Sequence, residues 1–273
     1  MLGATIPRMP TKPNVCAFCL RGDRQITTEH AIAQWIQELF PPHSQAVLCH
    51  GDSFKRSWEI GKKNAYRIND VCSCCNTPLG KIETVAHDIL KPLILNGMQT
   101  AITAEQARIL TAWFYKTVVA CDLIKPIRTE PYFSPEDRGR VVTVPIEAVG
   151  AIGNDLYVWI ASCLLDSYCV IWQADARLRP LYPGDSVRGP IYAHVSTLAI
   201  GKIAFQMFTL RIKGFPWKED PFPSGTVLRL WPQPEGTIGP IAKPLDPRSF
   251  GDFRRRLAPF GSPNHSYGFL FVT

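Results

Sequence analysis

Two pairs of cysteines constrain this chain more than any other feature of its sequence. Cys16 and Cys19 form a first C-x-x-C turn, and Cys72 and Cys75 form a second. Each turn can aim two thiolates at one point, so two turns can complete a tetrahedral zinc site. A single C-x-x-C is also typical of redox proteins, but two in one chain favour one structural zinc ion. Such a site would join segments that are far apart in sequence.

The number and setting of the cysteines indicate a reducing compartment. Nine cysteines cannot all pair within one chain, and the first ten residues lack the apolar run of a secretory signal. No stretch reaches the roughly 18–20 apolar residues that cross a bilayer. We therefore expect a cytoplasmic protein with no membrane span. Cys74 lies between two ligands and is expected to face away. The remaining cysteines are expected to be packing residues: Cys49, Cys121, Cys163 and Cys169.

The segment between the two cysteine pairs carries the residues that suggest chemistry. A simple zinc ribbon separates its pairs by about 15–20 residues, whereas here the whole of 20–71 intervenes. Glu29 and His30 lie within this segment, and Asn76 follows the second pair directly. A shared zinc ion would bring Asn76 close to Glu29 and His30. An acid, an imidazole and a carboxamide would then lie in one region.

This pattern resembles the HNH, or ββα-metal, nuclease family. The resemblance covers roughly residues 14–95: C-x-x-C, then Glu29-His30 with an apolar stretch containing Trp35, then C-x-x-C-Asn76 leading into a helix with Ile82-Glu83. It implies a bacterial or phage endonuclease that hydrolyses DNA phosphodiester bonds and leaves 5′-phosphate ends. It also implies that Glu29 and Asn76 hold one catalytic Mg²⁺ or Mn²⁺, with His30 as the general base. Oxygen ligands and a neutral imidazole suit these roles.

Two departures from the family pattern leave other interpretations open. Many members have proline where this chain has Ala33, and the family's central asparagine has no clear counterpart except Asn69 or Asn64. His30 could be a buried helix residue with Glu29 as a first-turn acid, and Asn76 could simply cap a helix. The chain would then be a non-catalytic zinc module that binds nucleic acid or a protein partner, or a purely structural zinc fold that serves the β-rich domain.

Basic residues between the cysteine pairs favour a polyanionic partner. The chain carries a net charge of +7, and lysine and arginine bind phosphates regardless of base sequence. DNA is therefore the expected partner, although a solvated strand face would have a similar composition. The predicted nucleic-acid-binding residues are Lys55, Arg56, Lys62, Lys63 and Arg67.

The rest of the chain predicts an α+β protein. Apolar spacing indicates a helix over 77–95 that Pro92 kinks or ends, and Thr103 and Gln106 form a capping box for a helix reaching about residue 123. Beyond residue 140, β-branched and aromatic runs between proline and glycine clusters indicate a mostly antiparallel β domain.

We divide the chain into three parts: an HNH-like domain at 14–95, a helical connector at 96–140 and a β-rich domain at 141–273. The β-rich domain holds no recognisable catalytic motif, so we expect it to restrain or target the first domain or to dock a protein partner. A fragment ending near Lys125 is then expected to keep zinc and some cleavage activity.

Overall fold

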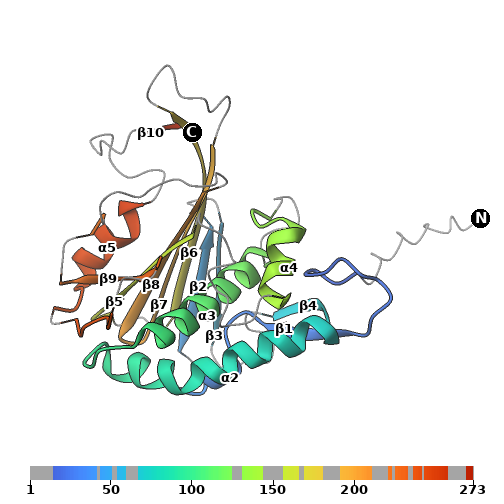
Figure 1. Cartoon of the computed structure of the whole chain (residues 1–273), viewed down its shortest axis with the longest axis horizontal. Helices are drawn as coiled ribbons and strands as arrows, with labels where there is room; N and C mark the ends of the chain where they lie inside the picture. The colour runs from blue at the N-terminus through green and yellow to red at the C-terminus, as the bar shows by residue number, and fades with distance from the viewer. Residues whose placement is uncertain are drawn as a thin grey trace, which may run out of the picture.

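The computed structural model describes most of the chain and shows an α+β architecture. The described residues are 15–41, 44–50, 54–59, 67–124, 131–143, 156–165, 169–180, 191–210, 221–222, 225–232, 236–241, 243–257 and 269–272. Within them, strands form a small sheet of two strands and a large sheet of eight. Figure 1 shows the large sheet with helix α5 (Pro247–Arg256) on one side and helices α2, α3 and α4 on the other.

The small sheet and helix α2 surround the cysteines. Strand β1 (Ile26–His30) pairs antiparallel with β4 (Arg67–Cys72), and α2 (Ser73–Asn96) follows β4 without a break. The second C-x-x-C therefore spans the junction between a strand and a helix. Pro92 does not end α2, because the helix continues to Asn96 and stops at Gly97, whose φ of 74° suits glycine.

Helix α3 (Ala104–Asp122) lies between α2 and the large sheet and forms the centre of the core. Its start has the predicted capping box, in which Thr103 and Gln106 exchange side-chain and backbone hydrogen bonds. Nearly every residue from Ile109 to Asp122 is buried. Trp113 and Phe114 both pack against Phe205 of the sheet, with ring centroids 5.7 and 5.1 Å away.

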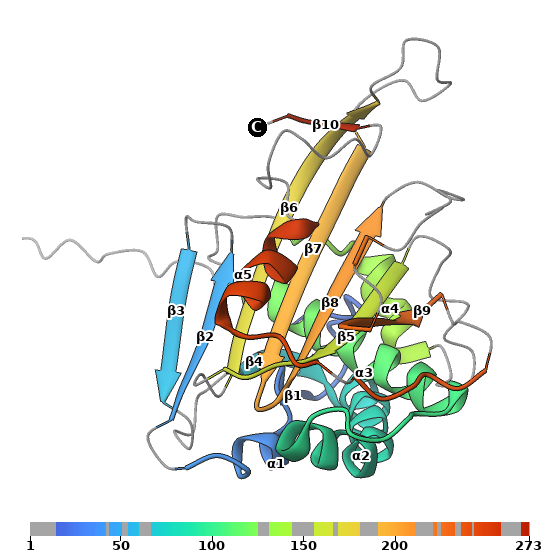
Figure 2. The same ribbon diagram turned by 90° about the vertical axis from the view of Figure 1, so that its left-hand side faces the viewer.

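The large sheet is covered on both faces. The strand order is β3-β2-β6-β7-β8-β5-β9, and β10 pairs with β6. In β5, Val158 and Ile160 face the core that contains α3, while Tyr157 and Trp159 face the core that contains Phe253 of α5. Figure 2 shows α5 lying across one face of this sheet. The strands are β2 (Gln45–His50), β3 (Phe54–Glu59), β5 (Leu156–Ser162), β6 (Cys169–Pro180), β7 (Ile191–Ile200), β8 (Ile203–Leu210), β9 (Val227–Trp231) and β10 (Phe269–Val272).

The large sheet is mostly antiparallel, as expected, but it is mixed, because β2 pairs parallel with β6 while the other pairs are antiparallel. Strands β2 and β3 come from the segment between the cysteine pairs, so the segment 14–95 contributes two strands to the sheet that we assigned to 141–273. The remaining described helices are α1 (Gln34–Gln37) and α4 (Pro135–Thr143).

Candidate metal centre and its surroundings

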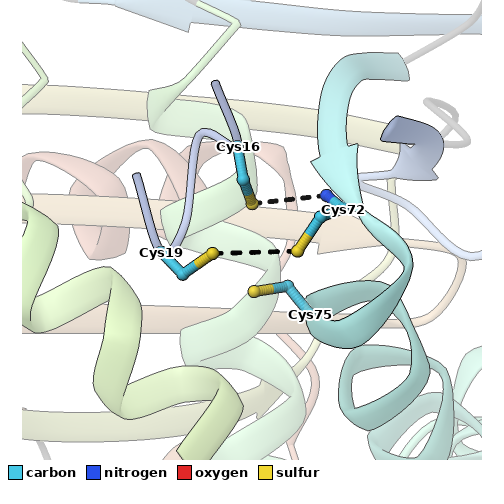
Figure 3. A group of neighbouring side chains, drawn as sticks. All are labelled: Cys16, Cys19, Cys72 and Cys75. Atoms are coloured by element: carbon cyan, nitrogen blue, oxygen red, sulfur yellow. Dashed lines mark hydrogen bonds between the residues drawn. The ribbon is translucent and has the colours of Figure 1, made fainter. Parts of the chain in front are cut away.

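The four predicted cysteines lie together and could hold one zinc ion. The sulfur atoms of Cys16, Cys19, Cys72 and Cys75 all lie within 4.8 Å of one another. The Sγ atoms of Cys19 and Cys72 are 3.7 Å apart, close to the roughly 3.8 Å edge of a tetrahedron with zinc–sulfur distances of about 2.3 Å. Figure 3 shows the four sulfurs pointing toward one centre, two from the loop before β1, one from the end of β4 and one from the first turn of α2.

Backbone amides favour a thiolate at this centre. The amide of Cys72 donates a hydrogen bond of 3.3 Å to the Sγ of Cys16. Burial raises the pKa of the Cys16 thiol, but hydrogen bonds from the backbone of Cys19, Cys72 and Phe18 outweigh it and lower that pKa to about 7. The backbone around Cys16 thus stabilises negative charge on its sulfur, as a zinc ligand requires, whereas burial raises the pKa of Cys72 and Cys75.

Helix α4 fastens the first cysteine pair to the rest of the molecule. Arg138 is buried, and its Nη1 donates a hydrogen bond to the carbonyl of Ala17, between the two cysteines. Burial lowers the pKa of Arg138, while the negative charges of Asp122 and Cys16 oppose this by favouring the charged guanidinium. The cysteine centre is therefore part of the larger core.

Glu29 and His30 lie on a strand, not on a helix. They are the last two residues of β1, and His30 is the direct cross-strand partner of Arg67 in β4. The Nε of Arg67 donates a hydrogen bond of 3.1 Å to the Nε2 of His30. This bond needs a lone pair on Nε2 and so a neutral ring protonated at Nδ1. Burial, Arg67 and Lys116 lower the pKa of His30, and Glu83 only partly opposes them.

Glu29 faces the interior, where it meets a lysine. Its Oε1 lies 2.5 Å from the Nζ of Lys116, a residue of α3 that is 0% exposed. Burial raises the pKa of Glu29, and the ion pair with Lys116 opposes this. The same Nζ lies 2.5 Å from Oε1 of Glu83 in α2 and donates a 2.8 Å hydrogen bond to the carbonyl of His30. Three elements therefore meet at one ammonium group.

Asn76 lies in the first turn of α2 and does not cap it, because the N-cap residue is Cys72. The Nδ2 of Asn76 donates hydrogen bonds to the Oγ1 of Thr27, at 3.0 Å, and to the carbonyl of Thr28, at 3.2 Å. Asn76 thus sits beside β1, near the strand end that carries Glu29 and His30, and it is hydrogen-bonded to Thr27 and Thr28. The alternative interpretation of Asn76 as a simple helix cap was wrong.

The predicted basic residues fall into two places. Lys55 and Arg56 are exposed on β3, an edge strand of the large sheet, and the Arg56 guanidinium lies 4.8 Å from the centre of the Trp58 ring. Arg67 lies beside His30 on β4, which pairs with β1, and is not part of the strand pair formed by β2 and β3. Lys62 and Lys63 lie outside the described residues.

Sequence reasoning did not single out Lys116, although the signal was present. Lys116 stands within an otherwise apolar run of α3, where an unpaired charge would be very costly. A lysine at such a position requires an acidic partner. The sequence alone could not show that two of them, Glu29 and Glu83, converge there from different elements.

Comparisons with known proteins do not assign this chain to a family. Models of protein families, curated proteins and solved structures were compared with it, and none gave a match. Within the described residues, no helix combines the length and the apolar character needed to span a membrane. The four cysteines are also the one group of three or more histidine, cysteine or acidic side chains, among the described residues, whose ligand atoms are close enough to hold a metal ion.

Proposed function

We propose that this protein is an HNH-type endonuclease in which a structural zinc ion holds together the segment bearing the catalytic residues. One observation carries the proposal: β1, β4 and the start of α2 are joined at the four cysteines, and the Glu29–His30 pair ends β1 within this unit. Two paired strands followed by a helix are what the resemblance to the ββα-metal nucleases implies.

In this proposal His30 is the general base. Its lowered pKa keeps the imidazole neutral at pH 7, as a base must be to accept a proton from water. Arg67 engages the Nε2 lone pair through its guanidinium, and guanidinium groups bind phosphate strongly. A phosphodiester near β4 would compete for Arg67 and release the His30 lone pair for proton transfer.

Glu29 and Asn76 are the proposed ligands of a divalent cation, Mg²⁺ or Mn²⁺. Lys116 contacts the Oε1 of Glu29, and a carboxylate has a second oxygen that can accept another partner. Asn76 offers a carboxamide oxygen from the adjacent first turn of α2. When bound, such a cation would neutralise charge that develops on the phosphate.

A second candidate function is a non-catalytic zinc module that binds nucleic acid or a protein partner. It is favoured by contacts that already occupy the two proposed catalytic residues of β1. Glu29 is paired with Lys116, and the Nε2 of His30 accepts a hydrogen bond from Arg67. In that case the exposed Lys55 and Arg56 would bind phosphates without any chemistry at His30.

Plasmid cleavage by the full, zinc-loaded chain separates the two candidates. We expect nicking that requires Mg²⁺ or Mn²⁺ and that falls at least 100-fold in His30→Ala, the scale on which general bases contribute. His87→Ala is the matched control, because His87 lies on the partly exposed side of α2, paired with Asp88. DNA binding without cleavage by the wild-type chain would favour the non-catalytic function, whereas equal cleavage by His30→Ala would exclude His30 as the general base.

A further inference from the structure

The most deeply buried charged group near the proposed site is the ammonium of Lys116. Its side chain is 0% exposed, while the side chain of Glu83 is 18% exposed and that of Glu29 is 6% exposed. The ammonium lies 2.5 Å from a carboxylate oxygen of each glutamate, so its charge is balanced inside the protein.

The contacts of Lys116 fix both proposed catalytic residues. One ion pair holds the side chain of Glu29, and one hydrogen bond holds the main chain of His30. The third contact, with Glu83, ties this arrangement to α2, the helix whose first turn carries Asn76. Because Lys116 lies in the middle of a buried helix, it cannot swing away into solvent as a surface lysine can.

We propose that Lys116 is a positioning residue for the proposed nuclease site, which it serves by holding the carboxylate of Glu29 in place for cation binding and by fixing the end of β1 at His30. This inference rests on the proposed function. Glu83 acts as the counter-carboxylate: it shares the ammonium and leaves Glu29 less than fully neutralised. Residues that orient metal ligands in this way typically affect metal affinity or activity by about 10- to 100-fold.

The same geometry would also suit the opposite role, in which Lys116 competes with the divalent cation for its oxygen ligands. The ammonium contacts three oxygens, two from carboxylates and one from a carbonyl, and these are ligand types that a divalent cation also uses. A lysine that merely fills the cation position would weaken metal binding, and its removal would strengthen it. The two roles therefore predict changes of opposite sign.

The test replaces Lys116 in the full chain and measures Mn²⁺ binding and plasmid cleavage separately. Lys116→Met removes the charge and keeps a long side chain, but it leaves two carboxylates without a cation. The double variant Lys116→Met/Glu83→Gln has the same net charge in this cluster as the wild type and so removes that repulsion. Lys91→Met is the matched control, because Lys91 is exposed on α2. Zinc content and circular dichroism identify the folded variants.

We expect both Lys116 variants to bind Mn²⁺ at least tenfold more weakly than the wild type, measured by water-proton relaxation, and to cleave correspondingly slowly. If the single variant does not fold, the double variant is the test. A double variant that folds but still binds Mn²⁺ weakly would show that Lys116 positions the site and does more than stabilise the fold. Unchanged or tighter Mn²⁺ binding in the folded double variant would overturn the inference. A wild-type chain that binds Mn²⁺ without cleaving DNA would overturn the nuclease function instead.

Discussion

Cys74 and Cys75 are neighbours with the same side chain and very different surroundings. Cys74 is exposed, whereas Cys75 is buried among the other three thiols of the centre. A closed tetrahedral zinc site uses four ligands, so the exposed thiol is free of that role. The difference makes a sharp comparison possible, because Cys→Ser removes one sulfur at each position.

We expect Cys75→Ser to lose its zinc and Cys74→Ser to keep one zinc ion per chain. Zinc binding to such sites supplies about 10–16 kcal/mol in small domains, so its loss should destabilise the β1, β4 and α2 unit strongly. Elemental analysis gives the zinc content, and thermal unfolding gives the stability. Equal zinc loss in the two variants would contradict the assignment of the ligands.

At the scale of single residues, sequence reasoning could identify the groups but not their partners. The spacing of C-x-x-C pairs is a local signal, and the cysteine cluster follows from it. The side-chain directions of Glu29 and His30 depend on β4 and α3, which lie far away in sequence. For this reason the alternative interpretation of these residues as helical was wrong, and the contact between Glu29 and Lys116 was not predicted.

Among the elements, the start of α3 offers a direct test of local stability. Thr103 accepts a hydrogen bond of 3.2 Å from the amide of Gln106, and Gln106 accepts one of 2.8 Å from the amide of Thr103. Removing an N-cap hydroxyl typically costs about 1 kcal/mol. We expect Thr103→Ala to lower the free energy of unfolding by that amount in urea titrations, with the exposed Thr100→Ala as control. An unchanged midpoint would show that packing alone fixes the helix start.

Strand β3 is the element on which electrostatic binding can be tested. Lys55 and Arg56 are exposed there, and each phosphate contact contributes about 0.9 to the slope of log K against log salt concentration. We expect Lys55→Glu/Arg56→Glu to weaken DNA binding uniformly across sequences and to reduce the slope by about 2. Lys91→Glu, which makes a charge change on α2, should leave the slope unaltered. If the double variant shows the same salt slope as the wild type, β3 is excluded as a DNA contact.

The sequence predicted the elements better than their pairing. The start of α3 follows local capping rules, with Thr103 at the expected position. The parallel pairing of β2 with β6 joins residues 46–50 to residues 169–173, and no local signal specifies it. Pro92 was expected to disturb α2, but it lies near the end of the helix, where little of the hydrogen-bond ladder remains to be broken.

For the whole molecule, the continuous core argues against independent domains. Trp113 and Phe114 of α3 pack on Phe205 of β8, and Arg138 of α4 holds the carbonyl of Ala17. A chain ending at Ile124 would lack these partners. We therefore expect this fragment to be aggregated or poorly ordered, in contrast to the sequence-based expectation, as judged by NMR dispersion and near-ultraviolet circular dichroism. A soluble fragment with dispersed signals and bound zinc would show that the segment 15–124 folds alone.

The insertion of β2 and β3 between the two cysteine pairs has a consequence for synthesis of the chain on the ribosome. The cysteine centre can close once Cys75 has emerged, but β2, which pairs with β3, gains its second partner only when β6 has been made, more than a hundred residues later. At translation rates of about 5–20 residues per second, this delay is on the order of ten seconds. During that time a hairpin of the future sheet has an unpaired edge while the zinc site can already be complete. The nascent chain is therefore most prone to aggregate in this interval, and early zinc binding would shorten the unanchored length of chain.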